Sequence, residues 1–151
     1  MRALVQRVTR AAVTSAPARG DVAVETGRIG PGLVALIGVT HDDEVAHADR
    51  LADKLAGLRI FPDDDDAMNL SVLDVGGGVL VVPQFTLYGD ARRGRRPSYV
   101  EAARPEVAEP LVDRVVVGLR ERGVEVRSGR FRTHMELELV NDGPVTLLVE
   151  I

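Results

Sequence analysis

Residues 32–39 read Gly-Leu-Val-Ala-Leu-Ile-Gly-Val, a continuous apolar run with turn-forming residues on either side. Because no polar side chains alternate with the apolar ones, the run predicts a strand that is buried on both faces. Residues 79–82, Val-Leu-Val-Val, have the same character and follow a triple-glycine turn at 76–78. Both runs are therefore predicted as buried strands, and the flanking segments as the elements that surround them.

Apolar residues that recur every three or four positions predict two helices. The first covers about 45–58, where Asp42 or Asp43 can cap its N-terminus. The second covers roughly 105–122 and follows a Ser-Tyr-Val-Glu sequence, starting at Ser98, that has the spacing of a capping box. Two amphipathic helices are enough to cover one face of a small sheet.

Alternation of apolar and polar residues predicts the remaining strands, and it is clearest over 131–140. A turn at 141–144 follows, and the other segments of strand character are 2–13, 21–25, 58–61 and 145–151. About seven strands and two helices, with several strands between the helices, predict an α+β fold. We expect one domain over 1–151: a small, barrel-like, largely antiparallel curved sheet with two helices packed on it.

The composition narrows the classes of function. The chain of 151 residues has no cysteine, which excludes disulfides, zinc–thiolate sites and a cysteine nucleophile. The three histidines lack a metal-binding spacing, so we do not expect a catalytic zinc site. A net charge of −4 argues against non-specific nucleic-acid binding. No apolar run approaches the length of a membrane span or a secretory signal, and we therefore expect a cytoplasmic protein without membrane contact.

Two segments have features that a structural role alone does not explain. Pro83 ends the regular pairing of its strand, and we expect it to expose the backbone N–H groups of Gln84 and Phe85, which could stabilise an oxyanion. The alternative, favoured on spacing alone, is a strand that simply leaves the sheet at a proline. The second segment, 141–146, consists of ordinary turn formers, and composition alone favours a turn over an active site.

Taken together, these segments make the chain resemble the D-aminoacyl-tRNA deacylases, formerly called D-tyrosyl-tRNA deacylases. The resemblance spans essentially the whole chain and rests on blocks in family order at 1–8, 58–61, 68–71, 84–88, 94–98 and 141–146. It implies a homodimer of barrel-like subunits that hydrolyses the ester between a D-amino acid and the terminal adenosine of tRNA. It also implies that no metal or cofactor takes part.

The resemblance assigns the substrate contacts. Gly143 and Pro144 match a cis pair that enters the partner subunit's pocket and leaves no room for an L side chain, and Arg7 matches the arginine that steadies this pair. Phe131 and Met135 match positions that contact the terminal adenosine. Rejection of L substrates would thus come from a built-in steric clash.

The catalytic groups follow from the same resemblance. Main-chain groups at Gln84, Phe85 and Thr86, next to Pro83, would position water and stabilise the oxyanion, with help from the ribose 2′-hydroxyl of the substrate. Thr146 is a candidate nucleophile, but no base lies near it in the sequence, so we rank it below main-chain catalysis.

A basic loop could contact the acceptor stem of tRNA through Arg92, Arg93, Arg95 and Arg96. Equal weight goes to the alternative that these side chains are solvated and paired with the acidic run 63–66.

The chain departs from the family pattern in two places. Pro83 stands where most members have serine, and Arg132, Thr133 and His134 stand where the family usually has Gly-Ala-Asp. If that glycine adopts a conformation closed to other residues, Arg132 would strain the chain or reshape the pocket rim. These departures leave open two alternatives to a D-specific deacylase that also removes glycine: a relaxed deacylase of small L-aminoacyl-tRNA, and a tRNA-binding homodimer with weakened catalysis.

Overall fold

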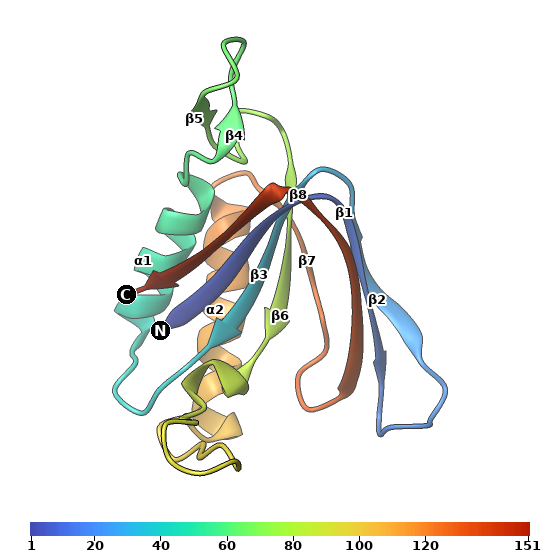
Figure 1. The fold of residues 1–151 in the computed structure, drawn as a ribbon, viewed down its shortest axis with the longest axis vertical. Coiled ribbons are helices and arrows are strands. Elements are labelled where there is room, and N and C mark those ends of the chain that lie inside the picture. Colours follow the sequence, from blue (N-terminus) through green and yellow to red (C-terminus); the bar gives the residue numbers. More distant parts are fainter.

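The longest pairing in the molecule joins its first and last strands. In the computed structural model, which describes residues 1–151, β1 (Arg2–Ala16) and β8 (His134–Glu150) run antiparallel along nearly their whole lengths. The other edge of β1 pairs with β3 (Gly32–Gly38) along its first half and with β2 (Val24–Ile29) along its second half. One edge of β1 therefore serves two neighbours, and the sheet curls around this strand (Figure 1).

Parallel pairing extends the sheet on the far side of β3. There β3 pairs with β6 (Gly78–Pro83), and β6 pairs with β7 (Glu125–Ser128). The curl brings β2 back against this parallel part, because a Cβ atom added at Gly27 would lie 2.8 Å from Cδ1 of Leu80 on β6. The predicted α+β class with a small barrel-like sheet is confirmed, and the sheet is mixed, with three antiparallel and two parallel pairings.

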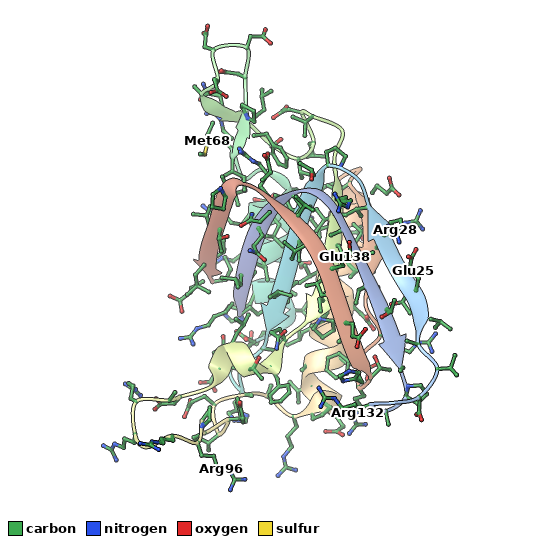
Figure 2. All side chains as sticks on the ribbon, turned by 45° about the vertical axis from the view of Figure 1, so that its right-hand side comes forward. Glu25, Arg28, Met68, Arg96, Arg132 and Glu138 are labelled. Carbon is green, nitrogen blue, oxygen red and sulfur yellow. The ribbon has the colours of Figure 1, made fainter.

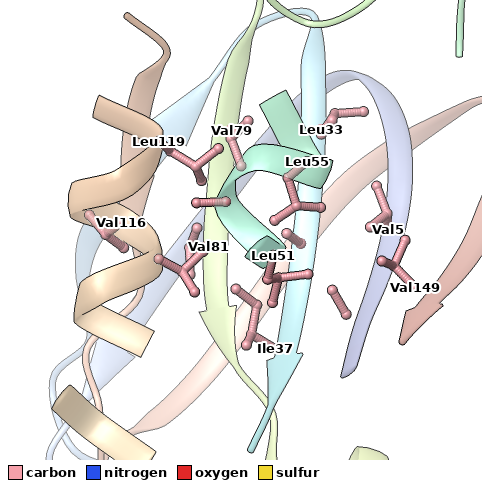
Figure 3. Packing of buried hydrophobic residues seen from close by; sticks show 14 of the residues in the cluster. Val5, Leu33, Ile37, Leu51, Leu55, Val79, Val81, Val116, Leu119 and Val149 are labelled. Carbon is pink, nitrogen blue, oxygen red and sulfur yellow. The ribbon is translucent and has the colours of Figure 1, made fainter. Parts of the chain in front are cut away.

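Two helices cover one face of the sheet, as predicted. They are α1 (Val45–Ala56) and α2 (Pro105–Glu121), and they pack side by side. A cluster of 28 buried residues lies between them and the sheet, where Leu51 of α1 is beside Ile37 of β3 (Figure 3). A second cluster of 7 buried residues fills the inside of the curl. Their burial from water is the main stabilising contribution to the fold.

The helix starts differ from the prediction. Glu44 caps α1 and forms a reciprocal capping box with His47, whereas Asp43 accepts from the N-terminal ammonium of Met1 at 2.5 Å. The predicted capping box at Ser98 is wrong, because Ser98 pairs with Asp90 in an isolated bridge and α2 begins only at Pro105. Asp43 is thus taken up by a long-range contact, whereas the cap at Glu44 is local to the helix start.

The strands also differ from the prediction at several points. β2 begins later than predicted, and the predicted strand at 58–61 is reduced to β4 (Phe61–Pro62), which pairs with β5 (Met68–Leu70) in a hairpin. β7 was not predicted. Residues 141–144 do not end a strand, since β8 continues through them. Neither helix is long and apolar enough to span a bilayer.

Candidate active site

A cavity of about 680 Å³ opens where β3 and β6 end. Its wall also includes the first half of α2, the segment before that helix, and residues around the start of β8. Of its 19 lining residues 13 are hydrophobic, so the cavity suits an uncharged group of nucleoside size. Five residues predicted from the sequence lie in its wall: Pro83, Gln84, Phe85, Phe131 and Met135.

The backbone after Pro83 differs from the expectation in one respect. The N–H of Gln84 donates to the carbonyl of Ile37 at 2.7 Å, so the expectation of a free N–H at Gln84 is wrong. Phe85 and Thr86 open the 3-10 turn η1 (Phe85–Tyr88), and the first N–H groups of such a turn have no acceptor within it. The available donors therefore belong to Phe85 and Thr86.

Side chains hold this turn in place at the cavity. The Gln84 amide donates to the hydroxyl of Thr86, which lies just outside the cavity wall. Phe85 is 57% exposed, and its ring meets Tyr99 edge-to-face, with 5.1 Å between the ring centroids. An exposed aromatic pair at the edge of an apolar cavity offers a stacking surface to an incoming base.

A second candidate feature is an excursion in the middle of β8. Gln6 pairs with Thr146 and Val8 pairs with Asn141, so Arg7 alone faces the four residues 142–145. Gly143 and Pro144 are exposed at its tip, and the peptide bond between them is cis. We call residues 141–146 the corner. None of them lines the cavity, and β8 bends at the end of the barrel opposite η1 (Figure 1).

Arg7 supports the corner from behind. Its Nη1 donates to the carbonyl of Ile60 at 2.6 Å, and its Nε lies 2.9 Å from Oδ2 of Asp142, although the Nε–H does not point along that line. A Cβ atom added at Gly143, whose φ is +114°, would lie 3.2 Å from Nη2 of Arg7. The Asn141 amide donates to the carbonyls of Arg7 and Val145. The corner is thus fixed at both of its ends.

Thr146 belongs to this hydrogen-bonded support. Its hydroxyl donates to Oδ1 of Asn141 at 3.1 Å and accepts from the amide of Gln6. Neither partner is a base, so the geometry offers no group to activate Thr146 as a nucleophile.

The basic loop protrudes at the end of the molecule where η1 lies (Figures 1 and 2). Arg92 pairs with Asp90 at 2.8 Å, and its hydrogen bonds lower the pKa of Asp90 to about 2. Arg93, Arg95 and Arg96 are exposed and form no ion pair. The predicted pairing with the acidic run is wrong, because 63–66 belong to the β4–β5 hairpin at the opposite end (Figure 1).

Sequence reasoning missed the wall that α2 and the preceding segment contribute. Tyr99, Arg104, Ala108 and Val112 line the cavity but lie well beyond Pro83 in the sequence. The two arginines in the wall, Arg104 and Arg132, come from different elements. Arg132 has a φ of +57°, the left-handed conformation that a glycine adopts without cost, as anticipated for this departure.

The family model of D-Tyr-tRNA(Tyr) deacylase matches residues 4–150. The chain belongs to this family. The deacylase family membership confirms the resemblance found in the sequence and the predicted enzyme class, a hydrolase.

Individual deacylases are similar over the same range. The D-aminoacyl-tRNA deacylase of Symbiobacterium thermophilum is 58% identical over 150 residues, which are 99% of this chain and 95% of the relative. The D-aminoacyl-tRNA deacylase of Geobacillus sp. is 54% identical with the same coverage. Among solved structures, a c-Myc DNA unwinding element binding protein superposes with a TM-score of 0.88 at 33% identity, over 100% of this chain and 99% of that one.

Proposed function

We propose that this chain hydrolyses the ester of D-aminoacyl-tRNA, and of glycine mischarged on tRNA, in the cytoplasm. One observation carries the proposal: the two donors that remain free after Pro83, at Phe85 and Thr86, open the turn that forms one edge of an apolar cavity. Relatives named D-aminoacyl-tRNA deacylase match nearly the whole chain. The cavity would hold the terminal adenosine, with Phe131 and Met135 against it.

The chemistry is that of an activated ester in a positioning site. A water oxygen attacks the ester carbonyl carbon, and the negative charge that develops on the carbonyl oxygen is stabilised by backbone N–H donors at Phe85 and Thr86. The bond to the ribose oxygen then breaks, and the proton lost by water ends on that oxygen. Free amino acid and tRNA are the products. Because the donors are main-chain groups, they act on the ester whatever the amino-acid side chain is.

The corner supplies the chiral selection, and it does so in a second copy of the chain. Within one subunit the corner lies away from the cavity, so Gly143 and Pro144 can meet a substrate only in a partner's cavity. Two features support a homodimer: the corner is exposed yet anchored by Arg7, and β8 beyond it exposes Leu147 and Leu148 at 39% and 55%. An exposed apolar strand next to a rigid projection is suited to self-association.

The basic loop extends the substrate contact beyond the ester. Arg92, Arg93, Arg95 and Arg96 lie at the same end as η1, and three of them carry charges that no carboxylate neutralises. We assign these four side chains to phosphates of the acceptor stem. Replacing them should raise KM for whole tRNA, with kcat unchanged, and reduce the dependence of KM on salt.

The test is hydrolysis of D-Tyr-, Gly- and L-Ala-tRNA by the purified protein, followed as loss of the labelled ester. Turnover of D-Tyr-tRNA and Gly-tRNA with L-Ala-tRNA left intact supports the proposal. Turnover of L-Ala-tRNA would instead identify a relaxed deacylase, and binding of all three without hydrolysis would identify a tRNA-binding protein. The protein used in this assay is unaltered, with Arg104 and Arg132 both in place.

A further inference from the structure

Two arginines are the only charged residues in the cavity wall. The other 17 lining residues are apolar or uncharged, whereas Arg104 and Arg132 bring two guanidinium groups. Arg104 immediately precedes α2, and Arg132 immediately follows Phe131 in the segment that leads into β8. The cavity wall, otherwise uncharged, therefore carries two positive charges.

A contact between their elements places Arg132 beside the first turn of α2, which Arg104 immediately precedes. Nη2 of Arg132 is 3.1 Å from Oε1 of Glu106, in the first turn of α2 and two residues after Arg104. The Arg132 and Glu106 side chains are 62% and 66% exposed, so this pair lies at the mouth rather than in the interior. Arg132 is at the same end of the molecule as Arg96, and Met68 of the β4–β5 hairpin is at the other end (Figure 2).

Neither arginine is the residue type that its backbone position favours. Arg104 occupies the N-cap position of α2, where Ser, Thr, Asp or Asn would bond a free N–H, but it forms no side-chain cap. Arg132 holds a φ of +57°, which disfavours residues with a Cβ atom. Backbone strain beside a cavity is a reason to look for a ligand, and a positive charge at the mouth defines its chemistry.

We infer that Arg104 and Arg132 bind the phosphate on the 5′ side of the nucleotide whose nucleoside enters the cavity. The inference rests on the proposed function and names the part of the substrate that the mouth recognises. A guanidinium group donates two parallel hydrogen bonds to phosphate oxygens, and phosphate carries the charge that the cavity interior could not accept. The basic loop at the same end would then meet phosphates further along the chain.

Glu106 gives this site an exchangeable partner. In the free protein its carboxylate takes the Arg132 guanidinium. This pairing holds Arg132 near the mouth before a ligand binds. When the nucleotide binds, a phosphate oxygen takes the place of the Glu106 carboxylate. Replacement of Glu106 by glutamine removes this competition and should raise the affinity for the phosphate-bearing ligand severalfold.

The experiment compares 5′-AMP, adenosine and inorganic phosphate as ligands of the whole protein, by calorimetry. We expect 5′-AMP to bind about tenfold more tightly than adenosine. Arg104→Gln or Arg132→Gln should each lower the affinity for 5′-AMP about three- to tenfold and leave that for adenosine unchanged. Arg132→Gly, which removes the charge and also the backbone strain, should behave as Arg132→Gln does. Arg28→Gln, at an exposed arginine paired with Glu25 on β2, is the control and should change neither affinity.

The outcomes separate this inference from the proposed function. Equal affinity for 5′-AMP and adenosine, or equal loss of both in the arginine variants, overturns the phosphate contact even if D-aminoacyl-tRNA is hydrolysed. Inorganic phosphate that binds as tightly as 5′-AMP also overturns it, because the mouth would then be a free anion site. An arginine-dependent preference for 5′-AMP without any ester hydrolysis supports the phosphate contact and refutes the deacylase proposal.

Discussion

Replacement of Arg7 by alanine tests whether the corner is held from behind. The Arg7 side chain is only 10% exposed and has two partners, the carbonyl of Ile60 and the carboxylate of Asp142. Removal of the guanidinium leaves the Ile60 carbonyl without that donor and releases Asp142. The corner then loses its contact with the segment that follows α1.

The loss in free energy of unfolding can be estimated from these two contacts. A hydrogen bond from a charged donor to a buried acceptor contributes about 1.5–3 kcal/mol. An ion pair to a partly exposed carboxylate adds up to about 1 kcal/mol. Arg7→Ala should therefore lower the free energy of unfolding by about 3 kcal/mol, which for a chain of this size corresponds to a fall in Tm of about 6–12 °C.

The assay is thermal and urea unfolding at one protein concentration, with an arginine on the same strand as control. Arg10 lies 3.9 Å from Glu138, and the two side chains are 61% and 80% exposed, so Arg10→Ala should cost less than about 0.5 kcal/mol. Arg7→Lys should fall between the two, because one ammonium group cannot serve both acceptors as the guanidinium does. If Arg7→Ala and Arg10→Ala have the same Tm and the same free energy of unfolding, the reasoning about the corner is wrong.

Three further predictions concern the site and the sheet. Thr146→Val should retain single-turnover hydrolysis within about threefold, whereas loss of a true nucleophile would cost about a thousandfold or more. Gly32→Ala should lower the free energy of unfolding by about 3 kcal/mol or more, because its Cβ would lie 1.9 Å from the carbonyl oxygen of Gly78; Gly30→Ala, with no atom within 4 Å, should leave it nearly unchanged when both are measured in urea. The Asp90 carboxylate should titrate near pH 2 in a carboxyl-detected NMR experiment, and Arg92→Gln should move its pKa towards about 4. Since folding lowers this pKa, any stabilisation by the Asp90 carboxylate is fully present above about pH 4 and is lost as the pH falls through about 2.

The central part of the fold follows from local patterns. The runs at 32–39 and 79–82 become buried strands and the two amphipathic stretches become helices, since burial fixes the period of apolar residues. β7 was missed because its four residues contain one buried side chain, Val126, and the strand is fixed by pairing with β6. The corner looked like a turn because its residues are turn formers. Its continuity within β8 depends on pairing with β1, more than 130 positions away.

The site was predictable only in part for the same reason. The residues after Pro83 were recognisable, but the acceptor that takes the N–H of Gln84 comes from Ile37, which no local pattern indicates. Arg104 and Val112 gave no signal at all, because only the tertiary fold brings α2 to the cavity. The motif resemblance indicated the segment after Pro83. The tertiary fold determines which backbone N–H groups of that segment are free to act as donors.

The central claim is that the corner of one copy completes the cavity of another. Mixing two variants that each lack D-selective hydrolysis tests it most directly, because the corner variant loses the selection and the cavity variant loses the hydrolysis. One variant has the corner tip replaced (Gly143→Ser with Pro144→Ser), and the other has the cavity filled (Ala108→Trp). After unfolding and refolding together, half of the dimers should be mixed, and each mixed dimer should hold one cavity and one corner that are both intact. The account predicts recovery of about a quarter of the D-selective hydrolysis of the unaltered protein. No recovery, from variants that each fold and exchange subunits, would contradict it.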